Sequence, residues 1–166
     1  HCHLSFPELQ SQLPQIRQAM AEAGVDRALC ICTTLEEFED VHALAMGYDN
    51  FWASAGVHPD NEGIAEPTVD KLLELAARPR VVAIGETGLD YYQMDQRKGG
   101  RSIADMEWQR DRIRTHLPGG AGWRETERER GRGRTQYIFG HRRDDTGFLG
   151  FVRVQDGDAD GWAPMN

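Results

Sequence analysis

The sequence lacks the features that mark membrane and secreted proteins. It contains no apolar run of about 18 residues and no hydrophobic segment of the signal-peptide kind. Cysteine is scarce, and the odd number of three, Cys2, Cys30 and Cys32, suits a reducing compartment better than a disulfide framework. These absences predict a cytoplasmic protein that does not enter a membrane.

An excess of positive charge is also missing. The 166 residues include 19 Lys and Arg against 27 Asp and Glu, which gives a formal net charge of −8. Such a chain has no general basic surface with which to hold a nucleic-acid backbone. A nucleic-acid substrate would therefore have to be held by local cations or by bound metal. The length favours one domain, and a hydrophobic content of 39% is enough for a core.

One stretch, residues 81–92, has the clearest pattern in the chain. Four apolar residues, Val81–Ile84, are followed by Gly85, Glu86 and, two residues later, Gly88. The apolar run predicts a parallel strand that is buried on both faces. The glycines allow a tight turn that brings the Glu86 carboxylate into a crowded space. Acids at the carboxyl ends of such strands carry chemistry in α/β proteins, although a helix-capping acid fits the same place.

Histidines stand at two further places where strands are expected to end. If His1 and His3 continue a strand, their imidazoles lie on one face and make half of a metal site. Two surface histidines at a frayed chain end fit the same spacing. His58 follows an expected strand over Phe51–Val57 and precedes Pro59, which favours a functional site over a core position.

Strands and helices alternate through residue 116. Cys30 and Cys32 belong to the first internal strand, where a place in the core is favoured over a metal role. The chain does not begin with Met, so we expect that residues before His1 are missing and that they supply a further strand. The pattern then predicts four βα units in a parallel sheet with right-handed crossovers. The expected strands are 25–32, 51–57 and 81–85, and the expected helices are 7–23, 34–46 (with a Thr34–Glu37 capping box), 67–76 and 103–116.

Three segments resemble signatures of the TatD family of metal-dependent deoxyribonucleases. They are His-Cys-His-Leu at 1–4, Gly-Val-His-Pro at 56–59 and Gly-Glu-Thr-Gly-Leu-Asp-Tyr-Tyr at 85–92, and the resemblance covers residues 1–116. It implies an α/β fold, namely a partial TIM-type (β/α) barrel of about four βα units, with one or two divalent ions (Zn, Mg or Mn). It also implies that His1, His3 and Glu86 are metal ligands and that His58 binds the substrate phosphate.

The reaction that the resemblance implies is hydrolysis of phosphodiester bonds in DNA, with DNA or another phosphodiester as the partner. The family's further ligands, two histidines and an aspartate, have no clear counterpart here, so the catalytic residues stay unassigned. One alternative is another amidohydrolase-type metalloenzyme that acts on amides, lactones or cyclic ureas. The other is a non-catalytic barrel fragment that self-associates through its exposed edge.

The sequence changes character at residues 117–166. Ten of these 50 residues are Gly and eight are Arg, and no apolar period is present in the first part. Since a barrel needs roughly 250 residues, we interpret this tail as foreign to the family, arising from a shifted reading frame or an unrelated coding end. We expect it to be poorly ordered and to supply no metal ligand, His141 included. Tyr137–Phe139 and Phe148–Val154 are strand-like exceptions that can add to the sheet edge.

Overall fold

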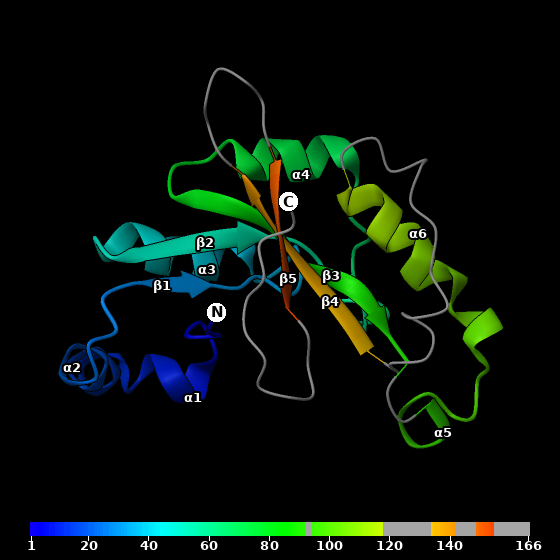
Figure 1. Ribbon diagram of the computed structural model, residues 1–166, viewed down its shortest axis with the longest axis horizontal. Helices are drawn as coiled ribbons and strands as arrows, with labels where there is room; N and C mark the ends of the chain where they lie inside the picture. The colour runs from blue at the N-terminus through cyan, green and yellow to red at the C-terminus, as the bar shows by residue number, and fades with distance from the viewer. Residues whose placement is uncertain (92–93, 118–133, 142–148, 155–166) are drawn as a thin grey trace.

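The computed structural model describes residues 1–91, 94–117, 134–141 and 149–154, the last two ranges by their backbone (Figure 1). The strands are β1 (Ala28–Cys30), β2 (Phe51–Ala55), β3 (Val81–Asp90), β4 (Arg134–His141) and β5 (Leu149–Val154). The helices are α1 (Pro7–Gln10), α2 (Leu13–Glu22), α3 (Phe38–Gly47), α4 (Val69–Ala76), α5 (Met94–Arg97), the 3-10 helix Ile103–Met106 and α6 (Glu107–His116). Within the described ranges, none of the helices is long and apolar enough to cross a membrane.

The strands form one sheet in the order β1-β2-β3-β4-β5. β1, β2 and β3 run parallel to one another, which confirms the mixed α/β architecture with parallel strands. β4 pairs with β3 and β5 pairs with β4, both antiparallel. These two strands fall on the strand-like segments of the tail and extend the sheet at its β3 edge, as the sequence predicts. The remaining residues of the tail lie outside the described ranges.

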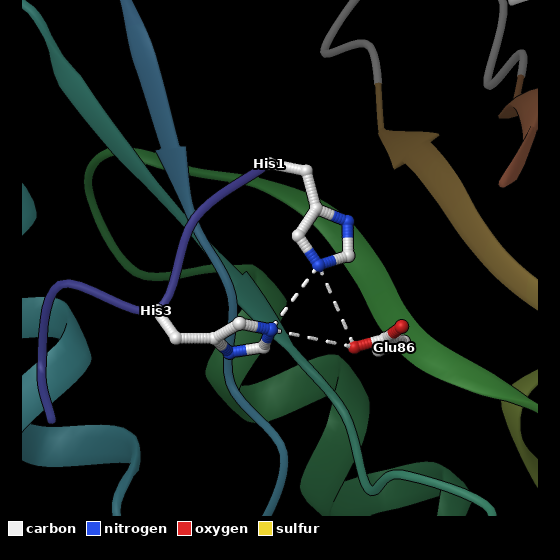
Figure 2. Close-up of side chains that lie close together, drawn as sticks. All are labelled: His1, His3 and Glu86. Atoms are coloured by element: carbon white, nitrogen blue, oxygen red, sulfur yellow. Dashed lines mark hydrogen bonds and ion pairs between the residues drawn. The ribbon is translucent and has the colours of Figure 1, made fainter. Parts of the chain in front are cut away.

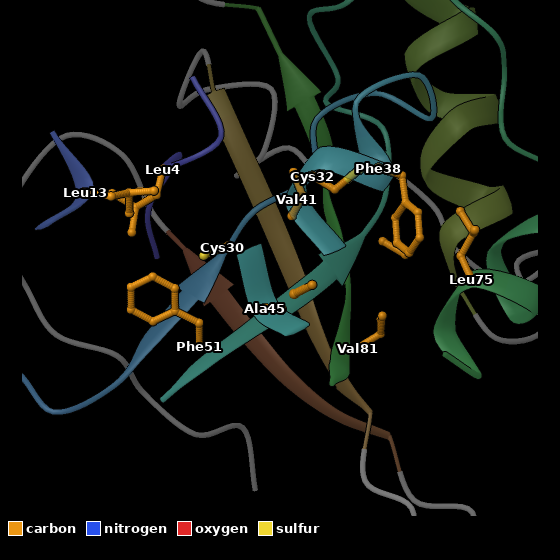
Figure 3. Packing of buried hydrophobic residues seen from close by; sticks show 12 residues of the cluster. Leu4, Leu13, Cys30, Cys32, Phe38, Val41, Ala45, Phe51, Leu75 and Val81 are labelled. Atoms are coloured by element: carbon orange, nitrogen blue, oxygen red, sulfur yellow. The ribbon is translucent and has the colours of Figure 1, made fainter. Parts of the chain in front are cut away.

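Helices cover the parallel strands, and the main core lies between them (Figure 3). α3 packs on β2, α4 on β2 and β3, and α6 on β3. Burial of an aliphatic or aromatic side chain contributes roughly 1.5–3 kcal/mol, so this layer accounts for much of the stability of the described part. The cluster consists of Leu4, Leu13, Cys30, Cys32, Phe38, Val41, Ala45, Phe51, Ala53, Ala55, Leu75 and Val81.

The helix predicted over 67–76 begins at Val69, and the one predicted over 103–116 is a 3-10 helix followed by α6. The other two predicted helices differ more. The helix predicted over 7–23 is interrupted between α1 and α2, because Pro14 lacks the N–H of a helix interior and is tolerated only in a first turn. α3 begins at Phe38 rather than Thr34. The predicted reciprocal bonds nevertheless exist: Glu37 N–H donates to Thr34 Oγ1 and Thr34 N–H donates to Glu37 Oε1, both at 3.2 Å, in the turn before the helix.

The predicted strands lie in the right places but differ in extent. β1 covers 28–30 of the predicted 25–32, and β2 covers 51–55 of the predicted 51–57. The expected strand at the start of the chain is a single parallel bridge between Cys2 and Cys30. β3 does not end at Gly85 but continues to Asp90, with an irregularity between Ile84 and Thr87. The reason is β4, whose antiparallel backbone supplies hydrogen-bond partners from Thr87 onward.

Two glycine backbones touch at the carboxyl ends of the parallel strands. A Cβ atom placed on Gly56 would lie 2.5–2.6 Å from backbone atoms of Gly85. Side-chain atoms do not approach a backbone this closely, so the pair requires glycine at position 56. The contact brings the segment after β2 against β3, directly beside Glu86.

Gly56→Ala is therefore expected to destabilise the fold by at least about 1–3 kcal/mol, the usual cost of forcing an extra methyl group into a packed site. Gly47→Ala is the matched control, because nothing lies within 4 Å of the position that its Cβ would take. Urea unfolding of the three proteins measures the difference. Equal midpoints for Gly56→Ala and Gly47→Ala would contradict the close contact.

Candidate metal centre

Two histidines and a glutamate converge at the carboxyl end of the parallel strands (Figure 2). The Nε2 atoms of His1 and His3 lie 3.2 Å apart. The Oε2 atom of Glu86 lies 3.7 Å from the first and 3.9 Å from the second. The histidines precede β1 whereas Glu86 lies in β3, so the tertiary fold brings the three residues together.

The backbone of Cys2 sets the direction of both histidines. Its N–H donates to the Leu29 carbonyl at 3.0 Å, and its carbonyl accepts from the Ile31 N–H at 2.9 Å. In an extended segment, the residues before and after a paired residue project to the same face. His1 and His3 therefore lie on one side, as their spacing predicts.

Glu86 reaches the cluster from a bend between two glycines. Gly85 and Gly88 have φ angles of 131° and 145°, a region that side chains disfavour. The Glu86 N–H donates to the Cys32 carbonyl at 3.3 Å. The carboxylate side chain is 4% exposed, against 21% and 29% for the two imidazoles. The cluster therefore opens to solvent on the side of the histidines.

The spacing of the three ligand atoms fits a divalent ion. A triangle with these three sides has its centre about 2.1 Å from each corner, which is the usual length of a bond from zinc to imidazole nitrogen or carboxylate oxygen. Two neutral imidazoles and one carboxylate are a donor set that zinc and related ions accept. The residues that are present therefore fit a metal.

The protonation of His3 favours the same role. Burial lowers the pKa of its imidazole below the ordinary value of 6.5, while the nearby charge of Glu37 acts in the opposite direction. The ring is then neutral at physiological pH. A neutral imidazole offers a nitrogen lone pair, which a metal ligand must have.

Cys30 and Cys32 lie in the core rather than in the cluster. Both are almost fully buried, at 1% and 0% exposure. Burial raises the pKa of the Cys32 thiol to about 12, and its Sγ donates to the Thr34 carbonyl at 2.9 Å. A thiol in this state does not ionise at neutral pH and is a poor metal ligand. The core interpretation of these two cysteines agrees with the structure.

His58 lies at the same end of the sheet but outside the triangle of ligand atoms. The backbone N–H of His58 donates to the Thr33 carbonyl at 2.8 Å. The neighbouring Cys32 carbonyl accepts the hydrogen bond from the Glu86 backbone. The ring is half-buried, and its Nδ1 accepts a hydrogen bond from the Asp60 N–H at 3.0 Å. The substrate-binding role of His58 stays a prediction, with which its position and contacts are compatible.

Two polar residues of α6, Arg112 and His116, contact this region, and the sequence analysis did not identify them. The buried side chains of this helix are those of Gln109, Arg112, Ile113 and His116. They recur at helical spacing, and this spacing was the available signal. Burial was not suspected because three of the four are polar.

The remaining predictions for the tail concern residues whose side chains are not described. His141 ends β4, a strand described by its backbone, so its exclusion as a ligand stays a prediction. The same holds for the expectation that residues 117–166 contribute no ligand at all.

Comparison with known proteins relates the chain to one protein family. A family model for TatD related DNase matches residues 1–114. The 3′-5′ ssDNA/RNA exonuclease TatD of Escherichia coli K12 is 45% identical over 71 residues, which is 42% of this chain and 27% of the relative. The uncharacterized metal-dependent hydrolase YjjV of the same organism is 39% identical over 101 residues, which is 57% of this chain and 38% of the relative.

A solved structure agrees with the fold. The crystal structure of YjjV, a TatD homolog from Escherichia coli K12, superposes with a TM-score of 0.53 at 29% identity. The match covers 70% of this chain and 46% of that chain. The matched part of these relatives is therefore less than half of their own length.

Metal binding gives the first test of the cluster. Titration calorimetry with Zn²⁺ should show binding to the wild type, weaker than the roughly 10–16 kcal/mol of a complete structural zinc site. Glu86→Gln should weaken it by at least about 100-fold, because even outer partners of metal ligands are worth 10–100-fold. Glu74→Gln on α4, an exposed acid, is the control. Equal affinities for the two variants would remove Glu86 from the metal role.

Acid should destabilise the fold because it protonates His116. Burial lowers the pKa of its ring from 6.5 to about 4, whereas the unfolded chain takes up the proton near pH 6.5. The contribution of His116 to the free energy of unfolding is thus fully present above pH 6.5. It falls by about 3 kcal/mol as the pH drops toward 4. His116→Gln should lack this component in urea unfolding at pH 7 and pH 4. Parallel losses in both proteins would contradict the assignment.

Proposed function

Because the chain belongs to the TatD-related DNase family, we propose that it carries the amino-terminal half of a divalent-metal centre for phosphodiester hydrolysis in DNA. His1, His3 and Glu86 are the proposed metal ligands, and His58 is the proposed substrate-binding residue. The chain spans only about a quarter to two fifths of the curated relatives that it matches. The activity of a complete family member is for this reason a proposal here.

The observation that carries the proposal is the convergence of three ligand atoms at the carboxyl edge of the parallel strands. In β/α barrels this edge is where substrates are bound and converted. An exposed cluster of acids would be weak support by itself. Here the carboxylate is buried to 3% residue exposure and faces two imidazoles, which are themselves only partly exposed.

A bound divalent ion would activate water and neutralise the charge that develops on the phosphodiester. The protein residues have separate tasks around it. The two imidazoles contribute ligand atoms without negative charge, so a single carboxylate leaves the loaded site net positive. This local charge attracts phosphate although the chain as a whole carries −8. The buried carboxylate is held by its backbone and needs little reorganisation.

A second candidate reaction is hydrolysis of a substrate other than nucleic acid. It is favoured by one of the relatives, since YjjV of Escherichia coli is named a metal-dependent hydrolase and not a nuclease. We also propose that the protein is cytoplasmic and that it self-associates through the exposed barrel edge.

Cleavage of a 5′-labelled single-stranded oligonucleotide tests the function. We expect hydrolysis that requires added Zn²⁺, Mn²⁺ or Mg²⁺, that stops with EDTA and that falls on the order of 100-fold in Glu86→Gln. The exposed-site variant Glu74→Gln should cleave like the wild type. Cleavage that continues in EDTA, or that is equal in both variants, would contradict the metal mechanism.

Turnover of ester or amide substrates with an intact oligonucleotide would instead favour the second candidate. Zinc binding without turnover of any substrate would identify a metal-binding fragment. That outcome would contradict the nuclease proposal for this chain.

A further inference from the structure

We propose that Arg112 and His116 of α6 are positioning residues that hold His58 in the tautomer with its proton on Nε2. In this tautomer Nε2 donates a hydrogen bond to an oxygen of the substrate phosphate. The step to the phosphate rests on the proposed function, whereas the positioning of the ring does not. The contacts that lead to it lie in the segment from Val57 to Asn61.

The tautomer follows from one contact of the ring. The Asp60 N–H donates to His58 Nδ1 at 3.0 Å, so Nδ1 must present a lone pair. In a neutral imidazole the other nitrogen then carries the proton. Nε2 is thus a donor, which suits a phosphate oxygen and does not suit a metal ion. The contact exists only while the turn from His58 to Asp60 keeps its shape.

Arg112 closes this turn from the side of α6. Its Nη1 donates to the carbonyls of both His58 and Asn61, each at 2.7 Å. One donor therefore ties together the two ends of a four-residue turn. Nη1 carries two N–H groups and can therefore donate to both carbonyls at once.

The position of Arg112 is itself tightly determined. The residue is 2% exposed, its Nε donates to Glu66 Oε2 at 2.9 Å, and its Cζ lies 4.8 Å from the centre of the Trp108 ring. A buried cation needs such partners, because removal from water is costly. The same partners prevent the guanidinium from swinging away from the turn.

His116 fixes the residue before His58. Its Nε2 accepts from the Val57 N–H at 3.0 Å, and its Nδ1 donates to the Arg112 carbonyl at 2.8 Å. The ring is 3% exposed and burial lowers its pKa to about 4, so it is neutral and keeps the acceptor at neutral pH. Val57 and His58 are consequently both bonded to the last turns of one helix.

The experiment follows the ring nitrogens of His58 by two-bond proton–nitrogen NMR, which distinguishes the two tautomers. The wild type should show a single form with the proton on Nε2. In Arg112→Met the turn loses both bonds, and the His58 nitrogens should shift toward a mixture of tautomers. Glu66 is 57% exposed and does not become a buried unpaired charge in this variant.

Matched variants separate positioning from general damage. Arg114→Met, on the same helix and with a side chain that is 35% exposed and paired with Glu107 and Asp111, should leave the His58 signals unchanged. His116→Leu should shift them, and His116→Gln should restore them, because glutamine can accept from Val57 and donate to the Arg112 carbonyl. Should Arg112→Met fail to fold, His116→Leu, which removes only the side-chain bonds of His116, carries the test of the positioning.

Inorganic phosphate added to the zinc-loaded protein tests the proposed hydrogen bond from His58 to phosphate. Its affinity should fall about 10-fold or more in the variants with mixed tautomers, in line with the cost of a misplaced binding group. Wild-type His58 signals in folded Arg112→Met, or in His116→Leu where Arg112→Met does not fold, would overturn the proposal. Shifted signals without any phosphate binding by the wild type would support the positioning and refute the role of His58 at phosphate, so the two failures are distinguishable.

Discussion

Backbone hydrogen bonds to three consecutive residues, Ile31–Thr33, hold together every segment that the candidate centre uses. The Ile31 N–H binds the Cys2 carbonyl between the two histidines, at 2.9 Å. The Cys32 carbonyl accepts from the Glu86 N–H at 3.3 Å, and the Thr33 carbonyl accepts from the His58 N–H at 2.8 Å. Ile31 and Cys32 are completely buried. The site is therefore held by backbone bonds to a segment that directly follows β1.

This arrangement requires backbones to meet where side chains would ordinarily separate them. Gly56 lies against Gly85, and the two glycines around Glu86 adopt φ angles near 131° and 145°. The space so freed is occupied by a nearly buried carboxylate facing two imidazoles. An unpaired carboxylate at such burial would carry a large desolvation cost. The neighbouring histidines offset part of that cost, and a cation bound among the three ligand atoms would offset more.

The residues that sequence reasoning found share one property: their pattern is local. His1 and His3 are two positions apart, and Glu86 follows an apolar run that ends in glycine, so spacing and strand ends were sufficient to predict their convergence. The contacts of Arg112 and His116 depend on how α6 lies against the segment after β2. A buried polar side chain gives no apolar period, and such a contact is visible only in three dimensions.

The extent of β3 was unpredictable for a related reason. Gly85 and Gly88 have the composition of a turn, and the strand continues past them because β4 supplies partners. β4 belongs to the tail, whose composition favours disorder over most of its length. The segments 137–139 and 148–154 were recognisable as strand-like by their aromatic and β-branched content. The antiparallel pairing of β4 with β3 and of β5 with β4 was not encoded in any local pattern.

X-ray absorption spectroscopy of the zinc-loaded protein tests the central claim most directly, because it identifies the atoms bound to the metal. The arrangement of His1, His3 and Glu86 predicts nitrogen and oxygen neighbours at about 2.0–2.2 Å, with the multiple scattering of two imidazole rings. The Glu86→Gln protein should lose this signature at equal zinc concentration. Sulfur neighbours at about 2.3 Å would instead place the metal on cysteine and contradict the proposed centre.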